Sequence, residues 1–352
     1  MARFSPHGNL RLSQSMPGSM DVTFAGCEAS VAVSYANLGG DSFFVTALPK
    51  NTLTDAVIKD LNSYLVNTSD VIHSSIGRLG TYYVEKGANQ RPSKVIYDRD
   101  NSTISLMKSD KYNWKNVLKN KSWLHVSGIT PALSKKAYKA TLCAVMKAKS
   151  LGLKTSCDLN FRSKLWAWDK KYNSQELARI KMPKILKYID ILIGNEQDAE
   201  DVLGIELSNT NFDKGNIDVN IYPNIAKKLY SKFTNLKLIA ITLRESLSAT
   251  HNRWGAMLYD CQNDNSYFSP TKNKNYSPFE IKNIVDRLGA GDSFAAGLIF
   301  SLNHLQLPYG ESLEFAVASS CLAHSIEGDF NLTSQDEVLK LMKGFSSGRV
   351  IR

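Results

Sequence analysis

A short stretch near the C-terminal end of the sequence combines residue types that could transfer a phosphoryl group. Residues 285–297 read VDRLGAGDSFAAG, in which Asp286 and Asp292 bracket a glycine-rich turn that runs into an apolar segment. Gly289 and Gly291 would leave backbone N–H groups free at the start of a helix, where these groups and the helix dipole attract an anion. Asp292, in the first turn, could orient an attacking hydroxyl group and take its proton. An ordinary turn, followed by a helix with an acidic residue in its first turn, would fit the same residues. The rest of the chain must therefore show whether this stretch is a catalytic site or an ordinary turn.

From about residue 120 onward, short apolar runs alternate with longer segments that carry apolar residues every three or four positions. The short runs are typical of buried strands and cover residues 123–127, 155–159, 189–193 and 238–242. Helical patterns cover residues 134–149 and 221–232. This alternation predicts βαβ units and an α/β fold, with a mainly parallel sheet covered by helices on both faces.

Polar side chains lie at or just after several of these runs. Asp158 and Arg162 accompany the second run, Asn195 follows the third, and Arg244 follows the fourth. In open α/β sheets, ligands bind in the crevice beyond the carboxyl ends of the strands. The sequence therefore predicts one site at that edge of the sheet, built from several segments.

The first hundred residues have a different pattern. Short strands are expected at residues 21–24, 80–85 and 94–97, and the one long helix expected among them covers residues 27–38. This pattern predicts a small β appendage beside the main sheet. Near the other end of the chain, the capping-box spacing of Ser334 and Glu337 predicts a helix that begins after Ser334.

The composition indicates a globular protein with one large domain. The chain has 352 residues, of which 43% are hydrophobic, and no apolar run approaches the roughly 18 residues that span a bilayer. Five widely spaced cysteines favour neither a disulfide framework nor a zinc site, so a soluble protein of the reducing cytoplasm is expected. The net charge of +10 comes largely from lysines at helical spacing, which is typical of solvated helix faces and does not indicate a nucleic-acid-binding protein.

The sequence resembles the PfkB-type, ribokinase-like sugar kinases, whose signature D-x-x-G-A-G-D is matched by Asp286, Gly289, Ala290, Gly291 and Asp292. Within that family it resembles the 2-dehydro-3-deoxygluconate kinases over nearly the whole chain. The stretches that carry this resemblance are RFSPHGNLRLSQ (3–14), GRLGTYYVEKGANQRPSKVIYDRDNS (77–102), SGITPA (127–132), DLNFRSKLW (158–166), GNEQDAEDVLGI (194–205), TLRESLSATHNRW (242–254) and GDFNL (328–332).

The resemblance implies a ribokinase-like α/β/α sandwich with a mainly parallel central sheet and a small β lid over the sugar. It implies a single domain over residues 1–352, with the lid at about 3–24 and 78–106 and the catalytic core at about 25–77 and 107–352. It also implies ATP and Mg²⁺ as cofactors, a homodimer formed through the lids, and phosphorylation of 2-dehydro-3-deoxy-D-gluconate on its terminal hydroxyl group in sugar-acid breakdown.

On the substrate side, the resemblance implies that Arg99 and Arg162 bind the sugar acid. Their planar guanidinium groups can hold a carboxylate in fixed geometry, although either arginine alone would also fit a surface ion pair. The other substrate-side positions implied by the resemblance are Gly26, Ser30, Tyr82, Tyr97 and Asp329.

On the nucleotide side, Asn195 matches the first residue of the family motif N-x-x-E, which acts near the phosphates through water and Mg²⁺. Asp198 stands in the fourth position, and its shorter carboxylate can still bind hydrated Mg²⁺. Thr242 and Arg244 match the segment that lines the ATP phosphates. The resemblance completes the site with Asp286, with Gly289, Ala290 and Gly291 as the anion hole, and with Asp292 as the catalytic base.

The sequence departs from the family pattern in two places. Residues 25–30 read AGCEAS where relatives have G-G-x-E-A-N, so Ala25 and Cys27 add side chains, and Ser30 replaces an asparagine that meets sugar hydroxyl groups. Relatives also have a strand ending in G-E ahead of the segment that matches residues 3–5, and without it the sheet would lack one strand.

Two alternatives stay open because of these departures. One is a PfkB-type kinase of another sugar, such as 2-dehydro-3-deoxygalactonate or fructose. The other is a catalytically weakened paralogue that binds sugar acids. Arg99 and Arg162 favour an acidic acceptor in either case, whereas no motif encodes the configuration at C4 of that acceptor.

Overall fold

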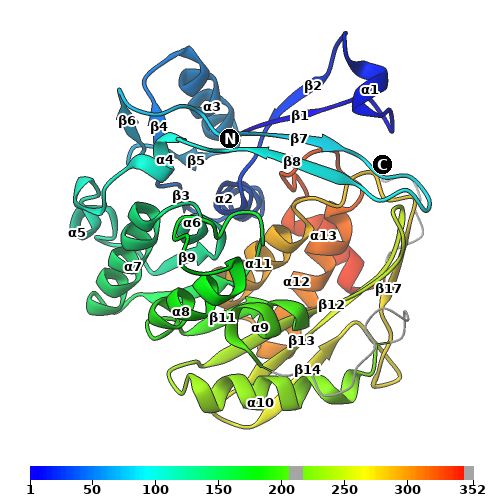
Figure 1. The fold of residues 1–352 in the computed structure, drawn as a ribbon. Coiled ribbons are helices and arrows are strands. Elements are labelled where there is room, and N and C mark those ends of the chain that lie inside the picture. The colour runs from blue at the N-terminus through cyan, green and yellow to red at the C-terminus, as the bar shows by residue number, and fades with distance from the viewer. Residues whose placement is uncertain (206–216, 345–352) are drawn as a thin grey trace.

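The computed structural model of the chain describes residues 1–205 and 217–344. Residues 206–216 and 345–352, which the predicted single domain also spans, lie outside the described residues. The centre of the fold is a seven-stranded sheet (Figure 1). Its strands are, in spatial order, β14 (Asn265–Ser269), β13 (His251–Asp260), β12 (Leu238–Ser248), β11 (Ile191–Gly194), β10 (Lys154–Asp158) and β9 (Trp123–Ser127), with β17 (Phe279–Lys282) also paired to β13.

The sheet is parallel from β9 to β12, and β13, β14 and β17 extend it with antiparallel pairs. The mainly parallel sheet predicted from the alternation of apolar runs and helical patterns is therefore confirmed. Parallel neighbours place their carboxyl ends at the same edge, where the polar residues of the sequence were expected to meet.

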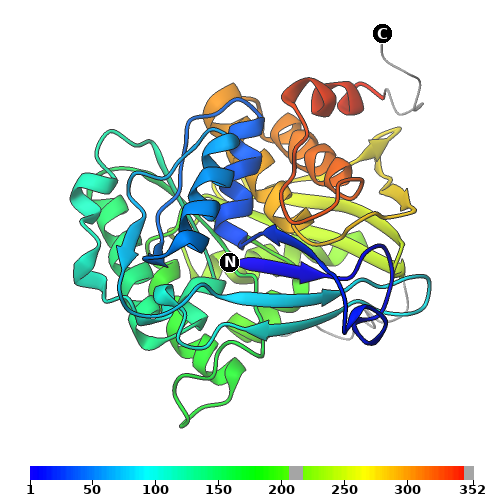
Figure 2. The same cartoon turned by 90° about the horizontal axis from the view of Figure 1, so that it is seen from above.

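Helices cover both faces of this sheet, as the view from above shows (Figure 2). One face carries α7 (Lys135–Ser150), α8 (Ser174–Leu186), α9 (Glu196–Leu203) and α10 (Tyr222–Lys232), and the other carries α2 (Cys27–Asn37), α11 (Ala290–Phe300) and α12 (Tyr309–Ala323), with α13 (Gln335–Met342) packed on α12. Separate apolar clusters fill the two interfaces, one around Met182 and one around Phe294, both fully buried. The predicted α/β/α sandwich is confirmed.

Local capping sets the start of two predicted helices. The Ser134 hydroxyl accepts the backbone N–H of Ala137 at 3.0 Å, and α7 begins at the next residue. Ser334 and Glu337 cap α13 reciprocally, as their spacing predicted.

A separate four-stranded sheet lies across the end of the core (Figures 1 and 2). Its strand order is β2 (Asp21–Phe24), β1 (Ala2–Ser5), β7 (Thr81–Glu85) and β8 (Lys94–Asp98). β2, β7 and β8 agree within one residue with the three strands that the sequence predicted, and β1 was not predicted. The β7–β8 hairpin also reaches the core, since the Asn89 carbonyl accepts the N–H of Ala249 at 2.7 Å.

The expectation of a single long helix in the first hundred residues was wrong, because α3 (Thr52–Ser63) is a second one. Asn51 caps it by accepting the N–H of Thr54. The helix buries Thr54, Val57 and Leu61, which lie three and four residues apart, so a helical pattern was present in the sequence and was overlooked.

Shorter elements complete the described chain. They are β3 (Ser42–Phe43), β4 (Ala47–Pro49), β5 (Val66–Asn67), β6 (Ile72–Ser74), β15 (Thr271–Lys272), β16 (Asn275–Tyr276), α1 (Leu12–Ser15), α4 (Thr103–Leu106), α5 (Trp114–Val117) and α6 (Ile129–Ala132). No helix within residues 1–205 and 217–344 is both long and apolar enough to cross a membrane.

Candidate active site

A cavity of about 420 Å³ lies between the carboxyl ends of the parallel strands and the four-stranded sheet. It gathers predicted site residues from segments far apart in the sequence. Those that line it are Gly26, Tyr82, Tyr97, Arg99, Arg162, Asn195, Asp198, Thr242, Arg244, Gly289, Ala290, Gly291, Asp292 and Asp329. Of the predicted residues, only Ser30 and Asp286 are missing from the described lining.

The glycine-rich turn forms the start of α11. Gly289 has a φ of +81°, and a side chain there would collide with the carbonyl oxygen of Asp329, so the turn requires glycine. Gly291 faces open space, since an added Cβ would meet no atom within 4 Å. Within the described residues, no acceptor binds the N–H groups of Ala290, Gly291 or Asp292. These three donors form an anion-binding start of a helix in the wall of the cavity.

Asp292 lies in the first turn of α11 and faces this cavity. Burial raises its pKa well above the usual range, and the carboxylates of Asp158 and Asp329 raise it further. A raised pKa makes the ionised carboxylate a better proton acceptor than an ordinary aspartate. Asp292 therefore has the position and the chemistry of a general base.

Four guanidinium groups line the same cavity, those of Arg99, Arg162 and Arg244 and that of Arg287, which had no predicted role. In the part of the chain that the structure describes, no carboxylate forms an ion pair with any of them. Burial lowers the pKa of both Arg99 and Arg244, which means that the surroundings do not compensate their charges fully. Unpaired arginines in a cavity favour anionic ligands.

Thr242 and Arg244 occupy a different place from the one expected. They lie inside β12 and not beyond its end, because antiparallel pairing with β13 continues β12 as far as Ser248. β12 thus extends past the edge of the parallel strands and forms a wall of the cavity.

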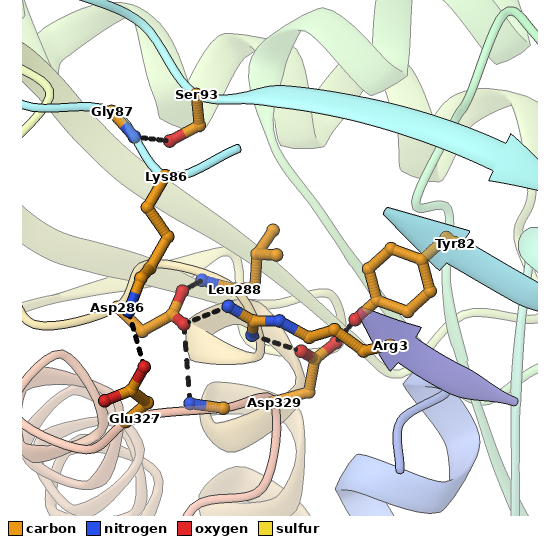
Figure 3. Close-up of polar contacts among 10 residues, drawn as sticks. Arg3, Tyr82, Lys86, Gly87, Ser93, Asp286, Leu288, Glu327 and Asp329 are labelled. Atoms are coloured by element: carbon orange, nitrogen blue, oxygen red, sulfur yellow. Dashed lines mark hydrogen bonds and ion pairs between the residues drawn. The ribbon is translucent and has the colours of Figure 1, made fainter. Parts of the chain in front are cut away.

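A buried ion-pair cluster joins the four-stranded sheet to the core (Figure 3). Arg3, in β1, is 1% exposed and donates one N–H to Asp329 at 2.7 Å and another to Asp286. Tyr82, in β7, donates its hydroxyl group to the second oxygen of Asp329 at 2.6 Å. Lys86, at the end of β7, pairs with Glu327. Arg3 had no predicted role, because the residues next to it do not indicate that Asp286 and Asp329 form ion pairs with it.

The same cluster explains why Asp286 lies behind the cavity wall. Besides Arg3, its carboxylate accepts the backbone N–H groups of Leu288 at 3.1 Å and Gly328 at 3.4 Å. Asp286 therefore holds the two loops that meet at Gly289 and does not itself line the cavity.

Two acidic side chains lie at the ends of neighbouring strands. Asp198 accepts the backbone N–H groups of Phe161 at 3.0 Å and Asn195 at 3.2 Å, and Asn195 in turn caps α9. Burial and the nearby Asp198 raise the pKa of Asp158, at the end of β10, to about 7. The sequence placed Asp158 at a strand end beside the predicted site but gave it no role there. Among the described residues, no group of three or more His, Cys, Asp or Glu side chains could hold a metal ion by itself.

The segment that departs from the family pattern lies at the start of α2. Ser30 is fully buried, and its hydroxyl group has no described hydrogen-bond partner. Cys27 lines the cavity, and its thiol lies 2.8 Å from Glu28 and 3.1 Å from the Ser127 hydroxyl. Glu28 also accepts the Thr130 hydroxyl at 2.8 Å. In this segment the side chain of Cys27 lines the cavity, and that of Ser30 does not.

We expect the buried His324 to make the folded protein sensitive to acid. It is 2% exposed, and burial lowers its pKa to about 4. Because the folded state holds fewer protons than the unfolded state between about pH 6.5 and 4, stability is present above this window and falls through it by about 3 kcal/mol. We expect His324→Asn, which can keep the donor to the Ser320 carbonyl, to flatten this pH dependence in thermal melts. An unchanged acid slope in that variant would contradict the assignment.

Comparison with known proteins places this geometry in a family. Residues 10–243 and 255–334 match the family described as pfkB family carbohydrate kinase. The crystal structure of 2-dehydro-3-deoxygluconokinase from Thermotoga maritima is 40% identical, with a TM-score of 0.87 over 98% of this chain and 97% of that chain. A PfkB family carbohydrate kinase from Listeria grayi is 28% identical, with a TM-score of 0.85 over 97% of both chains. The 2-dehydro-3-deoxygalactonokinase of Haloferax volcanii is 27% identical over 99% of this chain and 96% of its own length.

The family match covers both the catalytic turn and the segments that surround the cavity. It agrees with the anion-binding start of α11, with the acidic residue beside it, and with the α/β/α fold that brings them together. The chain belongs to the pfkB family of carbohydrate kinases.

Proposed function

We propose that the protein is an ATP-dependent, cytoplasmic kinase that phosphorylates 2-dehydro-3-deoxy-D-gluconate on its terminal hydroxyl group. The observation that carries this proposal is that four arginines share one cavity with Asp292 and have no carboxylate partner among the described residues. A nucleotide triphosphate and an acidic sugar are both anions, so one cavity that binds both needs more than one cationic side chain.

In the proposed reaction, Asp292 takes the proton of the acceptor hydroxyl group as its oxygen forms a bond to the γ-phosphorus of ATP, and ADP leaves. The N–H groups at the start of α11 would stabilise the charge on the transferring group. Arg99 and Arg162 would hold the acceptor carboxylate, and Arg244 would bind the phosphates of the nucleotide.

Asp158 and Asp198 fit a hydrated Mg²⁺ near the phosphates. The raised pKa of Asp158 beside Asp198 indicates negative charge that the described protein groups do not fully compensate. Carboxylate oxygens and water are the ligands that Mg²⁺ prefers, and the ion would neutralise charge on the phosphates.

Release of ADP from purified protein, ATP and Mg²⁺ tests this proposal directly. We expect turnover with 2-dehydro-3-deoxygluconate and a much lower kcat/KM with fructose and ribose. The epimer 2-dehydro-3-deoxygalactonate is the second candidate acceptor, because the Haloferax relative carries its name. ATP binding without turnover on any of the four acceptors would contradict the kinase and favour a sugar-acid-binding paralogue.

Arg99→Ala is expected to raise KM for the acidic acceptor by roughly 10- to 100-fold, because a charge-assisted pair with the carboxylate is lost. KM for ATP should stay within about twofold. Arg99→Lys is the matched control, since it keeps the charge and loses the planar guanidinium group. Its KM for the acidic acceptor should lie between that of the original protein and that of Arg99→Ala. An unchanged acceptor KM in Arg99→Ala would remove this arginine from the carboxylate site.

We also propose that the four-stranded sheet is the lid of the site and that two lids pair into a homodimer. The register aligns Val22, Phe4, Tyr83 and Ile96 in one row across all four strands, on the face opposite Arg3 and Tyr82. Val22 is 56% and Ile96 is 53% exposed. A row of this kind favours burial against a second copy.

Ile96→Lys should then convert a dimer into a monomer, as measured by light scattering. Val285→Lys is the control, because it replaces a similarly exposed aliphatic side chain outside the sheet. A mass that does not differ between the original protein and Ile96→Lys would contradict assembly through this face.

A further inference from the structure

Arg287 lines the active-site cavity without forming an ion pair. Its side chain is half-buried, and no carboxylate among the described residues lies within ion-pair distance of its guanidinium group. It occupies the second position of the signature D-x-x-G-A-G-D, which leaves this position open, so the resemblance to the family assigns no role to it. A cationic side chain that is held partly away from water without a counter-ion is unfavourable, and its presence needs an explanation.

The wall formed by β12 and β13 fixes the place of this guanidinium group. Its Nη2 donates to the side-chain oxygen of Asn252 at 2.7 Å and to the Ser248 carbonyl at 3.4 Å. Asn252 is fully buried in β13, between β12 and β17, so packing on both sides holds it in place. Neither Nε nor Nη1 of Arg287 has an acceptor among the described residues. The wall therefore orients the guanidinium group without using all of its donors.

Arg287 and Arg244 share one face of this wall. Arg244 lies directly opposite Trp254 in the register of β12 and β13, and both line the cavity. Asn252 is two residues from Trp254 along β13, so its side chain lies on the same face, about 7 Å further along the strand. The guanidinium group that Asn252 holds therefore lies beside that of Arg244. Burial lowers the pKa of Arg287, and the charge of Arg244 lowers it further, which agrees with two like charges side by side.

Two neighbouring guanidinium groups without an ion-paired carboxylate favour a ligand that carries several negative charges. The anion-binding start of α11 belongs to the same turn as Arg287, since Gly289 follows it by two residues. A chain of linked phosphates offers several anionic groups in a row, whereas a sugar acid offers one carboxylate. This wall of the cavity therefore fits the phosphate chain of a nucleotide better than it fits the acidic acceptor.

The other two arginines of the cavity come from different segments. Arg99 directly follows β8 of the four-stranded sheet and lies 5.8 Å from the ring centre of Tyr97, and Arg162 belongs to the segment that follows β10. The proposed function uses these two arginines for the acceptor carboxylate. Arg244 and Arg287, on the wall formed by β12 and β13, then remain for the nucleotide.

We propose that Arg244 and Arg287 form a phosphate clamp, which binds the phosphate chain of the nucleotide, and that Asn252 positions Arg287 for this contact. The inference rests on the proposed function, because it takes ATP as the ligand. It adds to that function a second nucleotide-binding arginine and the residue that orients it. Because ADP keeps two linked phosphates, the clamp binds the product ADP as well as ATP.

Calorimetric titration with ATP, ADP and adenosine, in the presence of Mg²⁺, tests the clamp. Arg287→Met should raise Kd for ATP and ADP by roughly 10- to 100-fold, because charge-assisted hydrogen bonds to phosphate are lost. Kd for adenosine, which has no phosphate, should change by less than about twofold. Arg287→Lys keeps the charge and loses the planar guanidinium group, so its Kd for ATP should lie between those of the original protein and Arg287→Met.

Two further variants complete the comparison. Asn252→Leu should raise Kd for ATP and ADP by roughly 3- to 10-fold, because Arg287 is present but no longer oriented. Arg253→Met is the matched control, since this arginine is the next residue of β13, lies on the opposite face and does not line the cavity. Its Kd values should equal those of the original protein.

Thermal melts separate ligand binding from a structural role of Arg287. An arginine that serves the fold lowers Tm when it is removed. Arg287→Met instead removes repulsion from Arg244, so Tm without nucleotide should be equal to or above that of the original protein. The rise in Tm that ATP produces should be smaller in this variant, because the affinity is lower.

Several results would overturn the clamp. One is a Kd for ATP and ADP in Arg287→Met that stays within about twofold of the original value. Another is an equal loss of affinity for adenosine, together with a lower Tm, which would make Arg287 a structural residue. A raised KM for the acidic acceptor with unchanged nucleotide affinity would place Arg287 at the acceptor instead. Unchanged Kd values in Asn252→Leu would remove Asn252 as the positioning residue.

Turnover with the four acceptors reports separately on the proposed function. If the original protein binds ATP and Arg287→Met weakens this binding, but no acceptor is phosphorylated, the clamp stands and the kinase proposal fails. If the acceptor is phosphorylated and Arg287→Met binds ATP as tightly as the original protein does, the kinase proposal stands and the clamp fails. An original protein that binds no ATP would refute both.

Discussion

Asp292→Asn is expected to lower kcat by roughly 10²- to 10⁴-fold, the range found when a general base is removed. Asparagine has nearly the same shape as aspartate and cannot take the proton of the acceptor hydroxyl group. ATP affinity should remain within about threefold, because the N–H groups at the start of α11 belong to the backbone. Steady-state kinetics and calorimetric titration with ATP measure the two effects separately.

Asp336→Asn is the matched control, since it makes the same chemical change in the first turn of α13, away from the cavity. Its kcat and Tm should equal those of the original protein. Near-normal turnover in Asp292→Asn would exclude this residue as the base. A fall in ATP affinity as large as the fall in kcat would assign it to nucleotide binding instead.

Arg3→Met is expected to lower the free energy of unfolding by roughly 3–5 kcal/mol, because it leaves the carboxylates of Asp286 and Asp329 buried without their partner. Burial by itself would lower the pKa of Arg3, but these two carboxylates raise it, which shows how strongly the three charges interact. The same change should lower kcat, since Asp286 and Asp329 hold the turn at Gly289. Denaturant unfolding and turnover at a temperature well below Tm measure the two effects.

A variant that combines Arg3→Met with Asp286→Asn and Asp329→Asn separates the loss of charge pairing from the loss of packing. It should recover a large part of the stability, because no buried charge is left unpaired. Turnover should remain low in this variant, since neutral amides do not fix the turn at Gly289 in the same way. Equal stability of Arg3→Met and the original protein would refute the role of the ion-pair cluster.

Local sequence signals were sufficient where neighbours along the chain decide the structure. The apolar run at residues 123–127 became β9 with the same bounds, and Ser134 and Ser334 set the starts of α7 and α13. The predicted end of β12 was wrong because a distant partner decides it, since β12 extends to Ser248 by pairing with β13. The helix α3 was missed for another reason, because the helical spacing of Thr54, Val57 and Leu61 was overlooked.

The residues at the strand ends could be predicted for the same reason that the parallel sheet could. Strand ends at one edge of a parallel sheet must lie near one another, so Arg162, Asn195 and Arg244 were expected in one crevice. The other candidate site residues came from the resemblance to the family. The places of Ser30 and Asp286 could not be predicted. The burial of Ser30 in α2 and the ion pair of Asp286 with Arg3 both depend on packing between distant segments.

The sequence by itself determined the family and the α/β class, because these depend on residue types at fixed spacing. Only the tertiary structure decided which charges are paired, because ion pairs depend on the packing of distant segments. Arg3 and Asp286 lie 283 residues apart in the chain and form an ion pair in the core, whereas Arg99 and Arg244 line the cavity without a carboxylate partner among the described residues.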